Sequence, residues 1–182
     1  MTVVGVTLDI SFVSGESDHV EFFRSVIGLE NANEGQFEEF AGSAFPALDW
    51  ADGIWRGLKQ FSRPYAAVRE ELVRCLGGLS DYGAACFQEY GAGDPRELAG
   101  VLSARVGAAV SDENGRTKRN AEARRDRTRH HQGVEKVFWW HVKLRPHVDR
   151  IHFRYEAGSG GYRQGRIVVG LFRDHCMLPG GG

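Results

Sequence analysis

Alternating apolar and polar positions in the last third of the chain predict three antiparallel strands. The runs cover Glu135–Leu144, Arg150–Tyr155 and Arg166–His175. Since successive side chains of a strand point to opposite faces of a sheet, the first two runs each combine an apolar face with a polar face, whereas the third is mostly apolar. If the runs are neighbours in one sheet, a single face carries five cationic or titratable side chains: His141, Lys143, Arg150, His152 and Arg154.

The rest of the chain predicts one more strand and a set of helices. Residues 4–12 alternate as a half-buried strand, and residues 17–28 have the apolar spacing of a short helix. Residues 30–46 show no clear pattern. Helical spacing returns over residues 50–106, with expected helix starts near residues 50, 64, 80 and 94. The pattern predicts an α+β fold in which a small antiparallel sheet, made of the N-terminal strand and the three C-terminal strands, packs against a helical segment.

Charge is distributed unevenly along this expected single domain. Up to Gly115 the chain holds 8 Lys and Arg against 18 Asp and Glu, and beyond it 15 against 6, so the formal charges are about −10 and +9. We therefore expect an acidic part over residues 1–110, a basic connector over 111–133 and a basic sheet part over 134–176. The connector is either a solvated linker or an electrostatic arm that lies along phosphates.

Composition excludes several classes of protein. No apolar run is long enough to span a membrane, and the N-terminal residues lack the features of a secretory signal. Three cysteines without a regular spacing favour a reducing cytoplasm. No close pair of histidines or cysteines has metal-ligand spacing, and no nucleotide-binding fingerprint is present, so we expect neither a metal nor a cofactor.

The polar face of the expected sheet has the residue types that metal-independent phosphodiester cleavage requires. That reaction needs a base for the ribose 2′-hydroxyl, an acid for the leaving oxygen and cations for the charge of the transition state. Histidine titrates near neutrality, and arginine binds phosphate through two parallel hydrogen bonds. His141 and His152 are the acid–base candidates, and the expected phosphate-binding residues are Lys143, Arg150, Arg154, Arg173 and His175.

The three strand sequences also resemble a known family. FWWHVKL, DRIHFRY and GRIVVGLFRDH are similar to the central strands of the RelE/ParE toxin superfamily. The resemblance implies a bacterial toxin–antitoxin or defence protein whose basic strands face RNA on the ribosome, with an antitoxin as its protein partner. The helical stretch over residues 50–106 departs from that family, whose compact toxins carry a shorter one.

Two functions therefore remain open for this chain. The first is an RNA-binding protein that acts as a metal-independent endoribonuclease, and the second is a non-catalytic accessory module that binds nucleic acid or protein. A further alternative concerns the acidic part. It either covers the basic face, within one molecule or across a dimer, and keeps it latent, or packs on the apolar side of the sheet with its carboxylates in water.

Overall fold

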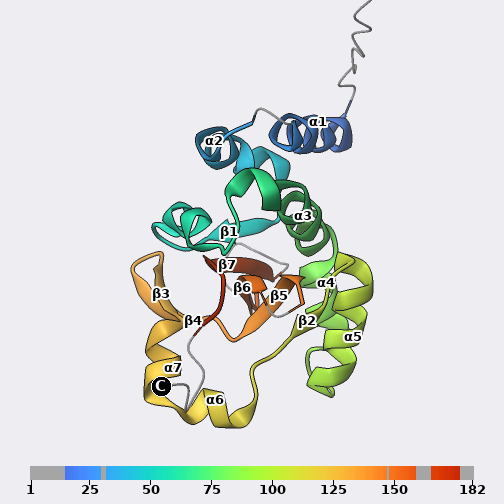
Figure 1. Cartoon of the computed structure of the whole chain (residues 1–182). Coiled ribbons are helices and arrows are strands. Elements are labelled where there is room, and N and C mark those ends of the chain that lie inside the picture. Colours follow the sequence, from blue (N-terminus) through green and yellow to red (C-terminus); the bar gives the residue numbers. More distant parts are fainter. Residues whose placement is uncertain (1–14, 30–31, 147, 159–164, 177–182) are drawn as a thin grey trace, which may run out of the picture.

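The computed structural model describes residues 15–29, 32–146, 148–158 and 165–176, and the strand expected over residues 4–12 lies outside these ranges. Its centre is a five-stranded sheet with the order β1-β7-β6-β5-β2. Figure 1 shows this sheet between two layers, with the helices of the first part on one side and a later segment on the other. The α+β class predicted from the sequence is confirmed.

The three C-terminal runs lie side by side, as predicted. They form β5 (Trp140–Arg145), β6 (Val148–Glu156) and β7 (Arg166–Arg173), and each is antiparallel to the next. The first run is shorter than expected because Phe138 and Trp139 divide it into two strands. The first of these belongs to a separate two-stranded sheet and the second to the five-stranded sheet. The residues before this break, Val134–Val137, form β4, which pairs only with β3 (Thr128–His131).

Two short strands form the edges of the sheet, and one of them, β1, makes it mixed rather than wholly antiparallel. β1 (Leu48–Trp50) runs parallel to β7, and β2 (Val110–Ser111) is antiparallel to β5. Trp50 was predicted to lie in a helix, which is wrong. Strands of two or three residues are too short to show a two-residue period, so local pattern could not reveal them.

The helices of the first part largely follow the prediction. They are α1 (Glu16–Gly28), α2 (Glu34–Ala44), α3 (Tyr65–Gly78), α4 (Ala84–Tyr90) and α5 (Pro95–Val106), with a 3-10 turn at Ile54–Gln60 and a π turn at Leu79–Gly83. Asp94 caps α5 as expected. α2 was not predicted, although Asn33 and Gln36 form a reciprocal capping box at its start.

The main core lies between these helices and the apolar face of the sheet. Val142, Ile151, Phe153, Ile167 and Val169 point into it from the strands and are completely buried. The described residues of the acidic part therefore pack on the apolar face, and the alternative in which they cover the histidine-bearing face of the same molecule is wrong. None of the helices in the described ranges is long and apolar enough to cross a membrane.

The opposite face of the sheet is covered by the segment between β2 and β5, residues 112–138, which we call the roof. It holds two short helices, α6 (Gly115–Arg119) and α7 (Ala121–Asp126), followed by the β3–β4 hairpin. Asn114 and Asn120 cap the helices by accepting hydrogen bonds from Thr117 N and Ala123 N. The basic connector is thus folded rather than a solvated linker.

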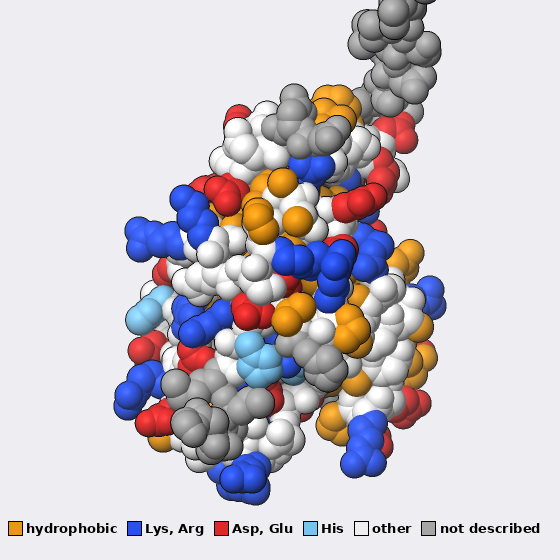
Figure 2. Space-filling model, in the orientation of Figure 1, with side chains coloured by type: hydrophobic (Ala, Val, Ile, Leu, Met, Phe, Trp, Pro, Cys, Tyr) orange, Lys and Arg blue, Asp and Glu red, His pale blue; other side chains and the backbone are white. Residues whose placement is uncertain are grey.

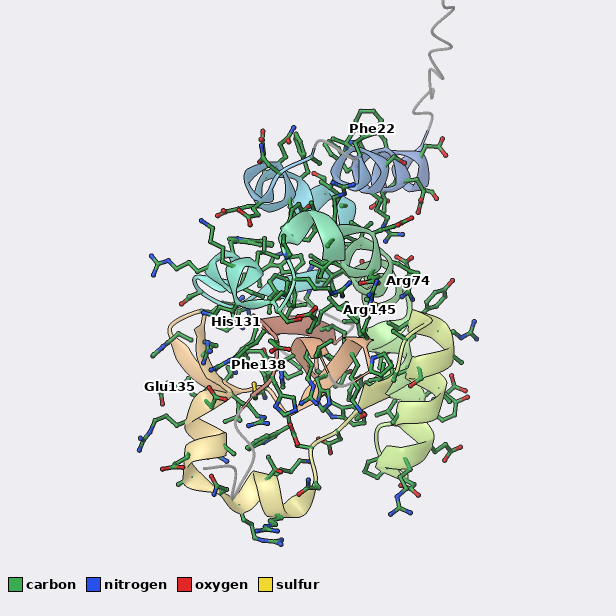
Figure 3. The ribbon with its side chains drawn as sticks, in the orientation of Figure 1. Phe22, Arg74, His131, Glu135, Phe138 and Arg145 are labelled. Carbon is green, nitrogen blue, oxygen red and sulfur yellow. The ribbon has the colours of Figure 1, made fainter. Side chains whose placement is uncertain are left out.

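Phe138 holds the end of the roof against the sheet. Its ring is completely buried and lies directly over Gly170 of β7, where an added Cβ would come within 2.3 Å of ring carbons. In Figure 3, Phe138 and His131 lie between the hairpin and the sheet, while Glu135 points away from both. Only a residue without a side chain permits this contact, which explains a glycine inside a central strand.

Candidate nucleic-acid interface

The cationic and titratable residues predicted to share a face do meet across the strands. His141 of β5 lies opposite His152 of β6, with ring centroids 5.2 Å apart. In the next row, Lys143 lies opposite Arg150, which in turn lies opposite Arg173 of β7. Alternation along β5 and β6 therefore positions these side chains, as the two-residue period indicated.

The roof buries much of this cluster. His152 is completely buried, and His141 and Arg150 retain only 5% and 8% of their exposure. Lys143 and Arg173 are half-buried. The predicted cationic face is therefore covered at its centre, because residues 112–138 lie over it.

Two of the predicted phosphate-binding residues lie away from the cluster centre. Arg154 is half-buried at the end of the roof, where its Nε lies 3.2 Å from Oε1 of Glu156. His175 follows the end of β7, and its Nδ1 lies 2.7 Å from the carbonyl oxygen of Cys176. The structure thus brings together His141, Lys143, Arg150, His152 and Arg173, but places Arg154 and His175 outside that group.

Burial keeps both histidines neutral near pH 7. It lowers the pKa of His141 to about 3, with smaller contributions from the charges of Arg150 and Lys143. It also holds the pKa of His152 well below its ordinary value, with His141 and Arg127 acting in the same direction. Neither ring is an imidazolium in the closed structure, so neither is a ready proton donor there.

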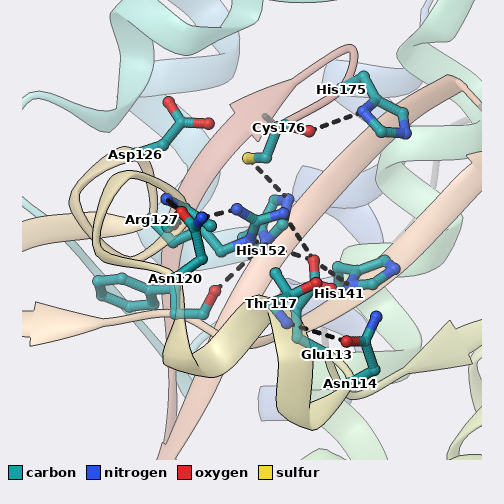
Figure 4. Close-up of polar contacts among 12 residues, drawn as sticks. Glu113, Asn114, Thr117, Asn120, Asp126, Arg127, His141, His152, His175 and Cys176 are labelled. Atoms are coloured by element: carbon teal, nitrogen blue, oxygen red, sulfur yellow. Dashed lines mark hydrogen bonds and ion pairs between the residues drawn. The ribbon is translucent and has the colours of Figure 1, made fainter. Parts of the chain in front are cut away.

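The tautomer of His152 follows from its two contacts. Its Nδ1–H donates to the carbonyl oxygen of Phe138 at 3.3 Å, so Nε2 carries the lone pair and accepts from the Cys176 thiol, also at 3.3 Å. Burial raises the pKa of Cys176 to about 11, which keeps the sulfur protonated and makes it a hydrogen-bond donor rather than a nucleophile. Figure 4 shows this chain of contacts beneath the roof.

A buried ion pair that sequence reasoning missed lies within the roof, where its carboxylate is 4.0 Å from His141 of the cluster. Arg127 is completely buried, and its Nε and Nη2 donate to Oε1 of Glu113 at 3.1 and 2.8 Å. Its Nη1 donates to the carbonyl oxygen of Ala123 at the start of α7. The asparagine caps were the available signal for folded helices here, but nothing in the local sequence distinguishes Arg127 from its exposed neighbours.

Two buried nitrogens of the cluster lack hydrogen-bond partners. One is Nδ1 of His141, whose nearest carboxylate oxygen, on Glu113, is 4.0 Å away. The other is Nε of Arg150. Unpaired buried polar groups are uncommon and costly, so they mark the part of the cluster where a further group fits best.

The outer side of the roof is the more accessible basic surface. Its exposed cationic and titratable side chains are Arg116, Arg119, Arg124, Arg125 and His130. A hollow of about 500 Å³ opens between α7 and β3, lined by Ala121, Arg124, Arg125, Thr128, Arg129, His130 and Glu135. Figure 2 shows that Lys and Arg side chains are spread over this view of the molecule with acidic side chains between them. The overall charge therefore does not locate a binding site, and a hollow lined mainly by basic side chains is the better guide.

Some of the charge separation along the chain is used in ion pairs between its two parts. Glu71 of α3 pairs with Arg145 at 2.9 Å, and Asp49 of β1 pairs with Arg166 at 2.8 Å. A third pair runs in the opposite sense, because the buried Asp149 of the basic part accepts from Arg63 at 2.9 Å. Figure 3 shows Arg145 beside Arg74, at the edge of the sheet nearest α3. Within the described ranges, no three His, Cys, Asp or Glu side chains are grouped as a metal site would require.

Comparison with known proteins identifies no relative of this chain. No protein-family model matches the chain, and searches of curated proteins and of solved structures find no significant similarity. The resemblance of the three strands to the RelE/ParE superfamily therefore stays a prediction.

Proposed function

We propose that this protein binds RNA through the outer surface of its roof. The observation that carries the proposal is the hollow between α7 and β3, where Arg124, Arg125, Arg129 and His130 face one acidic side chain, Glu135. Phosphate contacts from Arg supply most of the affinity in proteins that bind nucleic acid without sequence preference. This proposal keeps the prediction that the basic connector, residues 111–133, lies along phosphates. The connector does so as a folded segment packed on the sheet rather than as an extended arm.

The side chains around the hollow differ in how free they are to bind. Arg124 and Arg125 are exposed, and no ion pair joins either of them to another described residue. Arg129 is half-buried and donates to the carbonyl oxygens of Asp126 and Thr128. A fixed arginine flanked by two free ones suits a phosphate backbone, which needs charge and reach more than a defined base contact.

The test compares two double variants in binding to a fluorescent single-stranded RNA. Arg124→Ala/Arg125→Ala removes two charges from the hollow, whereas Arg56→Ala/Arg96→Ala removes two exposed charges elsewhere. We expect only the first to weaken binding and to reduce the slope of log K against log salt by about 1.4, the value for two phosphate contacts on a single strand. Equal affinities for the two variants, or no binding by the wild type at low salt, would overturn the proposal.

Metal-independent RNA cleavage is the second candidate, and the meeting of His141 and His152 beside Arg150 favours it. His141 would take the 2′-hydroxyl proton, the 2′-oxygen would attack phosphorus, and the resulting imidazolium would protonate the departing 5′-oxygen. The products are a 2′,3′-cyclic phosphate and a 5′-hydroxyl. The roof must open for this step, because both rings are buried.

Cleavage is tested with RNA alone and with translating ribosomes, in the presence of a chelator. We expect cyclic phosphate ends from the wild type and none from His141→Ala/His152→Ala, and slower growth of bacteria expressing only the wild type. Equal behaviour of the two proteins in both assays would exclude the histidine pair as a catalytic site, while RNA binding by the roof could still hold.

A further inference from the structure

The charge balance beneath the roof is incomplete at Arg150. Its side chain is more than nine-tenths buried, and the residues opposite it on both neighbouring strands are cations, Lys143 and Arg173. Its Nε has no hydrogen-bond partner, and no ion pair joins it to a described carboxylate. A buried charge normally requires a partner of opposite sign, because desolvation costs several kcal/mol.

The carboxylates nearby are already engaged. Glu113 accepts both hydrogen bonds from Arg127 through one oxygen, and Asp126 pairs with Arg173. Asp149 accepts from Ser62 and Arg63 on the other side. Glu113 and Asp174 still act on Arg150 through space, but neither contacts it within ion-pair distance. The described part of the chain therefore supplies no direct anion for this guanidinium.

A second unpartnered group lies on the same face. Nδ1 of His141 has no hydrogen bond and belongs to the strand next to Arg150. Lys143, two residues along that strand, adds an ammonium group to the row. Since adjacent strands are about 4.8 Å apart, these three side chains can converge on one tetrahedral anion. Arginine's planar fork matches two oxygens of such an anion.

We propose that the cluster beneath the roof binds one phosphate group, held by Arg150, Lys143 and His141. The site is separate from the hollow on the outer side of the roof, so it does not depend on RNA binding there. The ligand is inorganic phosphate or the terminal phosphate of a nucleotide, because both present the same oxygens. In either case it neutralises the guanidinium that the protein leaves unpaired.

The experiment measures thermal unfolding of the full chain against inorganic phosphate, with chloride keeping the ionic strength constant. We expect Tm to rise with the logarithm of the phosphate concentration above its Kd, by roughly 2–4 °C at about five times Kd. Arg150→Met should lose that rise while remaining folded, since an apolar side chain of similar length removes a buried charge. Arg124→Met/Arg125→Met, changed only on the outer side of the roof, should keep it.

The outcomes separate this proposal from RNA binding and identify the source of the phosphate. A larger rise with a nucleoside 3′-monophosphate than with inorganic phosphate indicates an RNA end, and the reverse indicates the free anion. Equal rises for the wild type and Arg150→Met, or no rise beyond that in chloride, would overturn the site. If Arg150→Met does not fold, isothermal titration of Lys143→Met with phosphate replaces it, since Lys143 is half-buried and tolerates substitution better. Weaker binding than that of the wild type supports the site, and equal binding overturns it.

Discussion

The two faces of the sheet are both buried, but by different means. On one face, completely buried apolar side chains such as Ile151 and Phe153 pack against helices, and the stabilisation grows with the area removed from water. On the other face the same strands carry His141, Arg150 and His152, and a polar segment covers them. That face depends on hydrogen bonds and ion pairs in addition to a small apolar cluster around Phe138. The unpaired nitrogens of His141 and Arg150 on the second face are the groups from which we infer a ligand, whereas the first face is held by apolar packing.

The apolar face should give the largest loss of stability on truncation. Phe153→Ala removes a completely buried ring that contacts Phe87 and Trp140, and we expect the free energy of unfolding to fall by about 4 kcal/mol. Arg154→Ala, the next residue and half-buried on the polar face, should cost less than about 1 kcal/mol. Urea unfolding of both variants measures the difference, and similar losses would contradict the contrast between the faces.

Breaking the ion pair of the polar face should cost slightly less. Arg127→Met leaves the Glu113 carboxylate buried without its partner, and we expect a loss of about 3 kcal/mol in the free energy of unfolding. Arg127→Met/Glu113→Gln removes both charges and should recover a large part of that loss. If the double variant is no more stable than the single one, the cost does not arise from the unpaired carboxylate.

Acid should destabilise the polar face through His141. The pKa of His141 is lowered in the folded protein to about 3 from an ordinary value near 6.5, so the unfolded chain binds more protons between these values. Stability is therefore complete above about pH 6.5 and falls as pH decreases toward 3, by up to about 1.4 kcal/mol per pH unit for this group. Urea unfolding of the wild type and of His141→Asn over this range measures the difference in slope, and parallel curves would contradict the assignment.

The smallest effect concerns the start of α7. Asn120→Ala removes the side chain that accepts from Ala123 N at 2.8 Å, and we expect a loss of about 1 kcal/mol in the free energy of unfolding. Asn120→Asp keeps the acceptor and should cost little. Glu122→Ala, exposed on the same helix, should stay within about 0.5 kcal/mol of the wild type. If Glu122→Ala loses as much free energy of unfolding as Asn120→Ala, the loss does not come from the helix cap.

The sequence predicted the apolar face well because its signal is periodic. β6, α3 and α5 have apolar positions at spacings that only one kind of element satisfies, and the histidine pair follows from the same two-residue period in β5 and β6. Adjacency of these strands was an inference from their order, and the structure confirms it.

The roof could not be predicted because its helices are only five and six residues long. Such short polar helices show no apolar stripe, and they are stable through their caps and through contacts distant in sequence. Whether a given arginine is exposed, like Arg125, or completely buried, like Arg127, depends on where α7 meets the sheet. β1 was missed for the related reason that its partner, β7, lies more than a hundred residues later.

The position of β7 also determines when the protein can fold during its synthesis. β7 lies between β1 and β6, so the strand that joins the early part of the chain to the late part is made after both. Until Arg173 has left the ribosome, β1 lacks its pairing partner and the apolar face of β6 lacks a neighbour on that side. The sheet is therefore completed late in synthesis, through contacts of large sequence separation, which are slow to form and leave apolar strands open to chaperones in the meantime.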